Sequence, residues 1–263
     1  MALSRRDFVK LCSGTVAGFG VSQMFHPAIH EAFAQTLTGE RPPVFWVQGQ
    51  GCTGCSVTLL NSTHPSIADV LLKIISLEFH PTVMAAEGEG AYEHMMRVAE
   101  KFKGKFIFAV EGAVPVAHDG KCCVVAEADH HEVTMTEVTK VLAANAAAVL
   151  AVGTCAAYGG IPAGKGNETG AMGVSAFLKK EGIPAPVINI PGCPPHPDWI
   201  VGTIGLGLQA LATNTLGLLV KQGLDANGRP KAFYKNVHMN CPHLSAFEAG
   251  HMVKTMGDKD GCR

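Results

Sequence analysis

The sequence predicts an α/β protein with a doubly wound parallel sheet over residues 40–215. Two observations lead to this fold class. Short apolar runs alternate with longer segments of helical periodicity, which is the pattern of βαβ units. The apolar runs lack polar alternation, as strands do when helices cover both faces of a sheet. After about residue 223 the chain turns polar and rich in Gly and Pro, so we expect an irregular segment there.

Each predicted element follows from a local pattern. Short apolar runs, several of them ended by a glycine-containing turn, predict strands at residues 44–47, 77–80, 105–110, 121–126, 147–152 and 187–190. The run 121–126 is interpreted as a short strand or an edge strand. Apolar residues at helical spacing predict a helix that begins near residue 56 and helices over 67–75, 91–103, 133–144, 174–180 and 200–211. Strand and helix therefore alternate along most of the chain.

Residues 1–34 have the organisation of an export signal. A pair of arginines stands before an aromatic residue in Arg5-Arg6-Asp7-Phe8, and a mildly apolar stretch rich in small residues follows. Ala32-Phe33-Ala34 then supplies a site that suits signal peptidase. The paired arginines indicate the twin-arginine route, which exports folded proteins, and so a periplasmic location. The alternative is a basic N-terminal tail. We exclude this segment, with Cys12, from the fold.

Charge and hydropathy exclude several classes of protein. The 21 basic and 22 acidic side chains nearly balance, and no basic stripe suggests binding to nucleic acid. The apolar part of the signal is too short and too rich in glycine to span a membrane. No other stretch reaches the ~18 uninterrupted apolar residues that a span needs. The sequence thus predicts a soluble mature chain without a transmembrane segment.

Four cysteines follow predicted strands. Cys52 and Cys55 come after the first strand, and Cys155 and Cys193 each come after a later one. In a doubly wound sheet, ligands bind beyond the carboxyl ends of the strands, so we expect the four thiols to converge at that edge. Glycines in the preceding turns let the backbone approach a bulky ligand closely.

Convergent thiolates suit an iron–sulfur cluster or a zinc ion. One CxxC joined to two isolated cysteines suits a cluster better than a zinc knuckle, which pairs two local CxxC units. Disulfides are the alternative in an exported protein, and Cys52 with Cys55 would also suit a redox CxxC. The redox interpretation leaves Cys155 and Cys193 unexplained. The pattern therefore favours a cluster, with disulfides and zinc left open.

A second group of ligand types lies near the end of the chain. His238 and Cys241 are three positions apart, and Cys262 follows. Histidine with thiolates binds zinc or a cluster. The stretch has no fourth ligand, so a surface histidine and a cysteine in the tail explain it equally well.

Three further motifs are interpreted as structural. Cys122 and Cys123 are adjacent in a predicted strand, where they face opposite ways, so core packing is expected rather than a shared metal. His130-His131-Glu132 is interpreted as a polar helix start rather than a metal site. The glycine-rich run 159–170 lacks the G-K-[ST] ending of a phosphate loop and does not directly follow a strand, so nucleotide binding there is rejected.

Several separate motifs, in order, establish a resemblance over the whole chain. These motifs are SRRDFVK, GCTGCS, LEFHPTVMAAEGE, VEGAVP, VGTCAAYGG, PGCPPHPDW and VHMNCP. Through them the sequence resembles the small, electron-transfer subunits of periplasmic nickel–iron hydrogenases. Within that family it is most similar to the nickel–iron–selenium type of sulfate-reducing bacteria. Many members have a Glu before the first CxxC, whereas Gly51 stands here, as it does in the selenium type.

The resemblance implies a flavodoxin-like N-terminal domain with a proximal [4Fe–4S] cluster. Cys52, Cys55, Cys155 and Cys193 match the ligands of that cluster. The nickel–iron centre, where H₂ is split, lies in a separate large subunit of the heterodimer. Electrons then cross proximal, medial and distal clusters to a partner such as a multihaem cytochrome c. Such proteins act in anaerobic respiration, and the resemblance allows a peripheral association with the membrane.

His238, Cys241 and Cys262 match three ligands of the distal [4Fe–4S] cluster. The family continues past this point with the last distal ligand and the ligands of the medial cluster, [3Fe–4S] or [4Fe–4S]. We therefore expect residues 223–263 to be the start of a C-terminal cluster domain that is truncated here. From the residues alone a second interpretation also stands, namely an exported binding protein of similar fold, stapled by disulfides and without a cofactor.

Overall fold

A computed structural model describes residues 41–62, 65–234 and 243–253 of the chain. The chain divides into two compact units, Met1–Pro230 and Lys231–Arg263. In the second unit the described residues include the short helix α11 (Leu244–Glu248). The predicted signal at residues 1–34 lies outside the described residues, as do His238, Cys241 and Cys262.

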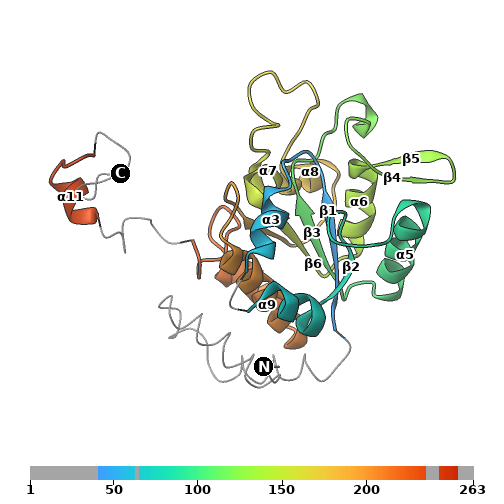
Figure 1. Cartoon of the computed structure of the whole chain (residues 1–263), viewed down its shortest axis with the longest axis horizontal. Helices are drawn as coiled ribbons and strands as arrows, with labels where there is room; N and C mark the ends of the chain where they lie inside the picture. The colour runs from blue at the N-terminus through green and yellow to red at the C-terminus, as the bar shows by residue number, and fades with distance from the viewer. Residues whose placement is uncertain (1–40, 63–64, 235–242, 254–263) are drawn as a thin grey trace. The chain divides into compact units, whose positions relative to one another are not determined.

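The first unit is built on a five-stranded sheet in which all neighbouring strands run parallel (Figure 1). The strands are β1 (Pro43–Gln48), β2 (Ser76–Phe79), β3 (Ile107–Glu111), β6 (Ala148–Val152) and β7 (Val187–Ile190). Their spatial order is β2-β1-β3-β6-β7. This is the order of flavodoxin-like sheets, in which the strand order reverses beside the first strand. The predicted fold class is confirmed.

Helices connect the strands, and the six predicted ones begin close to the expected positions, whereas two short helices, at residues 153–158 and 216–218, were not predicted. They are α3 (Gly54–Leu60), α4 (Ile67–Asp69), α5 (Gly88–Lys101), α6 (Met135–Asn145), α7 (Gly153–Tyr158), α8 (Val174–Lys180), α9 (Pro197–Ala212) and α10 (Leu216–Leu218). Two π-helical turns, Val70–Ile74 and Leu219–Gly223, continue α4 and α10, and His118–Gly120 forms a 3₁₀ turn. Helix α6 starts at a capping box, in which Thr134 and Glu137 each accept from the other's backbone N–H.

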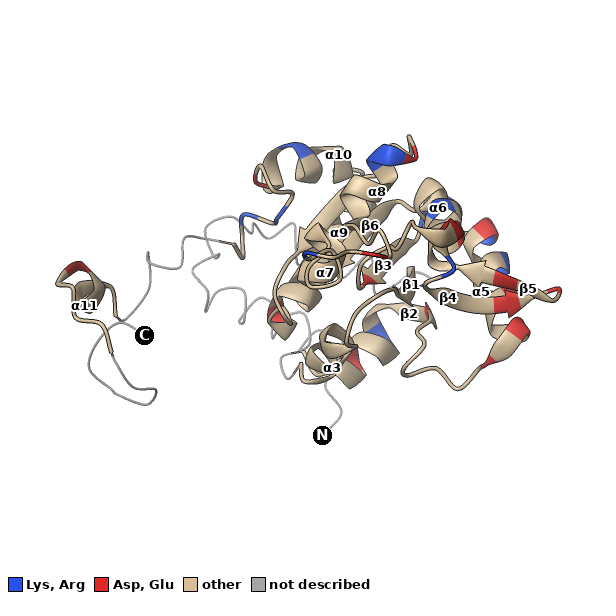
Figure 2. Ribbon diagram, turned by 90° about the horizontal axis from the view of Figure 1, so that it is seen from above, with Lys and Arg blue, Asp and Glu red and all other residues tan. Residues whose placement is uncertain are grey.

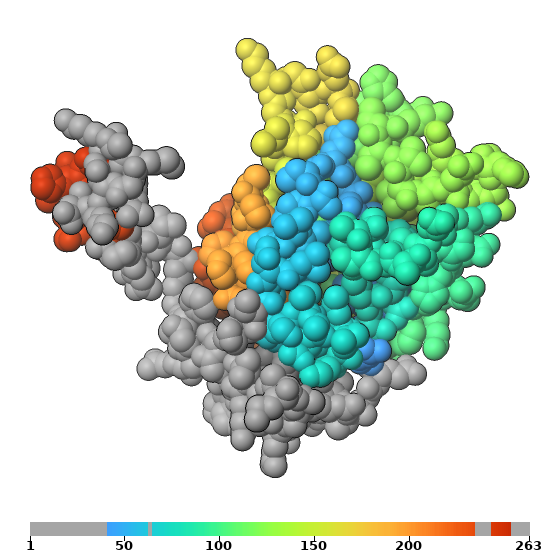
Figure 3. Space-filling view, viewed as in Figure 1, coloured from blue at the N-terminus to red at the C-terminus, as the bar shows by residue number. Residues whose placement is uncertain are grey.

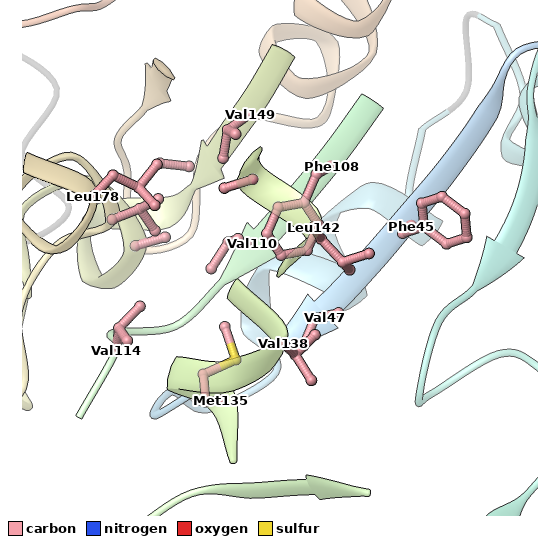
Figure 4. Close-up of a cluster of buried hydrophobic side chains, with 14 of the residues drawn as sticks. Phe45, Val47, Phe108, Val110, Val114, Met135, Val138, Leu142, Val149 and Leu178 are labelled. Atoms are coloured by element: carbon pink, nitrogen blue, oxygen red, sulfur yellow. The ribbon is translucent and has the colours of Figure 1, made fainter. Parts of the chain in front are cut away.

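Alternate residues of each strand pack on opposite faces of the sheet. On one face Phe45, Phe108 and Val149 meet Leu142 of α6 and Leu178 of α8 in a single buried cluster (Figure 4). On the other face the central strands are covered in part by α9, which contacts β7 and α3. Strands β1, β3 and β6 are buried almost throughout, which explains why their sequences lack polar alternation.

The segment between β3 and α6 differs from the prediction. It forms an antiparallel hairpin of β4 (Val124–Ala128) and β5 (His131–Thr134). The expected strand at 121–126 begins three residues later, and the interpretation of His130-His131-Glu132 as a helix start was wrong. The cause is the two-residue turn at Asp129 and His130, whose φ angles of 50° and 62° are those of a hairpin turn. Asn-Gly or Asp-Gly at these two positions would have predicted a hairpin turn, whereas Asp-His does not.

The two adjacent cysteines lie in the turn before this hairpin. Cys122 is exposed, whereas Cys123 is partly buried and packs against the core. The prediction of core packing therefore holds for Cys123 and was wrong for Cys122. Several acidic residues lie on α5, β4 and β5, whereas the central strands β1 and β6 are tan (Figure 2). Among the described residues, no helix has the length and apolar character needed to cross a membrane.

Candidate metal centre at the carboxyl ends of the strands

The four predicted cysteine ligands lie beyond the carboxyl ends of β1, β6 and β7. Cys52 precedes α3 and Cys55 lies in its first turn, while Cys155 lies in α7 directly after β6. Cys193 follows β7 by three residues. The surfaces of residues near 50, 160 and 190, in blue, yellow and orange, adjoin on one face of the molecule (Figure 3). The topology thus brings together thiols that lie far apart in the sequence.

The four thiols are close enough to affect one another's pKa. Burial, the Glu111 carboxylate and the thiols of Cys52, Cys155 and Cys193, in that order of effect, all raise the pKa of Cys55. Burial also raises the pKa of the Cys155 thiol, although a backbone hydrogen bond from Ile161 opposes the rise. Thiolates crowded in this way repel one another, so their charged form needs cations between them.

Two glycines leave room beside these thiols. Gly153, the residue after β6, has a φ of +88°, and a Cβ built on it would lie 2.4 Å from Sγ of Cys55. Gly160 has a φ of +55°, and its Cβ would lie 2.7 Å from Sγ of Cys155. Only glycine allows both the left-handed backbone and the close approach of these sulfurs.

The donor set fits an iron–sulfur cluster. Thiolate is the ligand that holds [4Fe–4S] clusters, with one cysteine for each of the four irons. The six described cysteines, which include these four, are free thiols. Within the described ranges, no three His, Cys, Asp or Glu side chains are arranged to hold a single metal ion. A [4Fe–4S] cluster does not need three ligands on one metal ion, because each of its four cysteines binds a separate iron of a bulky group.

Glu111, which the sequence analysis did not identify, lies at the centre of the site. It is the last residue of β3 and only 2% exposed. Its Oε1 accepts from the backbone N–H of Cys55 at 2.9 Å and of Ser56 at 3.2 Å. Its Oε2 accepts from Trp46 Nε1 at 3.0 Å, from Gln48 Nε2 at 3.2 Å and from the Ser56 hydroxyl. The carboxylate therefore ties the first turn of α3, with Cys55, to the central strands.

A shallow polar cleft of about 420 Å³ lies beside the first cysteine loop. Gln50 and the loop 161–169 line it, and the Thr169 hydroxyl donates to Gln50 Oε1 at 2.9 Å. The glycine-rich run follows α7 rather than a strand, as predicted. Ile161, at its start, is 84% exposed, which is unusual for a large apolar side chain.

Comparison with known proteins identifies relatives along the whole chain. The family model described as NADH ubiquinone oxidoreductase, 20 Kd subunit, matches residues 52–206. The periplasmic [NiFeSe] hydrogenase small subunit of Desulfomicrobium baculatum is 51% identical over 269 residues, which cover 100% of this chain and 84% of the relative. The hydrogenase-2 small chain of Escherichia coli K12 is 36% identical over 258 residues, which cover 98% of this chain and 64% of the relative. The chain thus spans less than two thirds of that second relative.

The chain is also similar to solved structures of [NiFeSe] hydrogenases. The recombinant [NiFeSe] hydrogenase from Desulfovibrio vulgaris Hildenborough matches with a TM-score of 0.83 and 66% identity, over 87% of this chain and 82% of that chain. The Ni-Fe-Se hydrogenase from Desulfomicrobium baculatum, in a reduced, active form, matches with a TM-score of 0.79 and 51% identity, over 85% and 81%.

Proposed function

Because the chain belongs to the small subunits of [NiFe] and [NiFeSe] hydrogenases, we propose that it is the electron-transfer subunit of a heterodimer that oxidises or evolves H₂. The large-subunit partner would carry the nickel–iron site. The observation that carries the proposal is the meeting of the Cys52, Cys55, Cys155 and Cys193 thiols at one edge of the sheet. When bound there, a [4Fe–4S] cluster supplies one-electron transfer.

The protein's own residues prepare this site in three ways. The four cysteines would hold the proximal cluster, and glycines 153 and 160 leave space for their sulfurs. The carboxylate of Glu111 holds the backbone of Cys55 in place. Partial burial of Cys55 and Cys155 lowers the dielectric around these two thiols, and hydrogen bonds to sulfur, such as the one from Ile161 to Cys155, would adjust the potential of a bound cluster.

The proposal also covers the division of the chain, including parts that lie outside the described residues. Residues 1–34 would be a twin-arginine signal that directs the folded subunit to the periplasm, and 40–215 the flavodoxin-like domain. Residues 223–263 would begin a cluster-binding segment, in which His238, Cys241 and Cys262 supply three ligands of a distal [4Fe–4S] cluster. A multihaem cytochrome c would accept the electrons.

The test is purification of the complex from its host without oxygen. We expect a larger, nickel-bearing subunit to co-purify, together with iron and sulfide. A colourless monomer without iron, its cysteines oxidised in pairs, would support the disulfide-stapled binding protein instead and reject the proposal.

A matched pair of variants tests the ligand assignment. Cys155→Ser should lose the iron of one cluster and its absorbance near 400 nm, because serine is a poor ligand for these irons. Cys122→Ser, at an exposed cysteine outside the group, should keep all of the iron. Equal iron contents in the two variants would remove Cys155 from the ligand set.

A further inference from the structure

His80 is a buried histidine that the proposed function does not use. It follows β2 directly and is 2% exposed. Its ring stacks on Trp46, with 5.3 Å between the ring centroids and 22° between the planes. Its Nδ1 accepts from the backbone N–H of Thr82 at 3.1 Å. That bond leaves Nδ1 without a proton, so the neutral ring carries its proton on Nε2. Burial, the largest effect, lowers the pKa of His80 and favours this neutral ring.

The hydrogen bonds from this ring run in one direction. Nε2 of His80 lies 3.2 Å from the Ser56 hydroxyl oxygen. Because Nε2 is the ring nitrogen that carries the proton, His80 donates this hydrogen bond and the Ser56 oxygen accepts it. The Ser56 hydroxyl also accepts from Gln48 Nε2 at 2.9 Å, so its own proton is directed at Oε2 of Glu111. Ser56 is 1% exposed, so these hydrogen bonds are shielded from bulk solvent.

Glu111 is the acceptor at the end of this chain of hydrogen bonds. Its other partners are an indole N–H, an amide N–H and two backbone N–H groups, all of which donate. A carboxylate that only accepts is ionised, because a protonated one would need an acceptor of its own. A negative charge therefore stands buried beside the cysteine group, and hydrogen bonds from one side offset part of it.

We propose that His80 is a positioning residue of the proximal centre, which acts through Ser56 to orient and partly offset the Glu111 carboxylate that holds the backbone of Cys55. The proposal rests on the proposed function, since it concerns the same cysteine site. It assigns to His80, Ser56 and Glu111 a joint effect on the reduction potential of a bound cluster, with no contact between His80 and the metal.

Substitutions at Glu111 on one hand, and at His80 and Ser56 on the other, should shift the midpoint potential of the cluster in opposite directions. Glu111→Gln removes the buried charge, so reduction becomes easier and the midpoint potential moves to more positive values. We expect at least a tenfold change in the equilibrium constant of reduction, which is about 59 mV for one electron. His80→Phe keeps an aromatic ring over Trp46 but removes the donor that offsets the charge, so the potential moves to more negative values. Ser56→Ala breaks the same chain and shifts the potential in the same direction.

The experiment uses the purified heterodimer and measures the potential by EPR-monitored redox titration, with iron content determined on each sample. His80→Gln should return the potential toward the wild-type value, because its amide supplies an N–H donor again. His94→Phe is the control, since it removes a histidine that contacts a carboxylate, that of Glu78 at 2.9 Å, outside this chain of hydrogen bonds. We expect it to leave the potential unchanged.

The outcomes separate this proposal from the proposed function. Wild-type protein without iron would reject the function itself. Full iron in the wild type, with His80→Phe and Ser56→Ala both at the wild-type potential, would overturn only the role of His80. Loss of iron from both variants would also overturn it, because that result assigns the residues to folding alone.

Discussion

Replacement of Gly153 by alanine tests most directly whether Cys55 is held by a ligand. Gly153 adopts a φ of +88°, and an alanine Cβ would lie 2.4 Å from Sγ of Cys55. A free cysteine side chain can rotate away from such a contact. A thiolate bound to a cluster cannot, because its sulfur is fixed by the metal. The same substitution therefore has two different costs, depending on the state of Cys55.

The loss of stability expected for Gly153→Ala has two parts. The left-handed backbone costs an alanine roughly 1–2 kcal/mol relative to glycine. Overpacking against a fixed sulfur adds about 1–3 kcal/mol. Gly182→Ala is the matched control, because Gly182 has a φ of +69° and its Cβ would meet no atom within 4 Å. It should show the backbone cost alone.

The assay compares iron content and melting temperature of the two variants as purified heterodimers. We expect Gly182→Ala to keep its iron and Gly153→Ala to lose part of it. At about 2–4 °C for each kcal/mol, the extra cost should lower the melting temperature of Gly153→Ala by about 2–12 °C beyond the control. Full iron in Gly153→Ala, with the same melting temperature as Gly182→Ala, would refute the conclusion that the Cys55 sulfur is fixed.

Three further predictions concern the fold. Thr134→Ala removes the cap of α6 and should cost about 1 kcal/mol in unfolding free energy, whereas Thr213→Ala, at an exposed hydroxyl after α9, should cost clearly less. Backbone and side-chain hydrogen bonds from Thr134 lower the pKa of Glu137 below its ordinary value of 4.5, so its stabilising effect is complete above that pH and is lost as the pH falls further. Glu137→Gln should therefore flatten the loss of stability below pH 4.5 in urea titrations, and an unchanged slope would contradict this sign. Phe177→Ala, at a fully buried position of α8, should cost about 3–5 kcal/mol, and a loss below about 1 kcal/mol would show that the core collapses around the gap.

The central strands were predictable because burial leaves a strong local signal. Residues 148–152 are apolar without exception and end at Gly153, and the structure buries all five of them in β6. The convergence of the cysteines was predictable for a related reason. Parallel strands present their carboxyl ends at one edge, so a cysteine after each strand is brought to that edge by topology alone.

The hairpin was less predictable, because its turn depends on backbone angles rather than on composition. Asp129 and His130 both adopt positive φ, a conformation that Asp and His visit less often than glycine does. The backbone N–H of Asp129 donates to Glu89 of α5 at 2.8 Å, so a contact 40 residues away helps to hold the turn. A local pattern contains no sign of such a contact.

Glu111 shows why the chemistry around the site was harder to find than the ligands. In the sequence it is one polar residue at the end of an apolar run, where a solvated carboxylate is the ordinary expectation. Its five donors come from β1 and from the start of α3, at positions 55 to 65 residues earlier. A buried carboxylate needs such donors, because an unpaired charge in the core costs several kcal/mol. The Trp46 indole, the Gln48 amide and the Ser56 hydroxyl are therefore fixed by one acceptor on the neighbouring strand. That dependence makes the set testable as a unit, since loss of the acceptor removes the partner of the buried Trp46 indole and of the Ser56 hydroxyl proton.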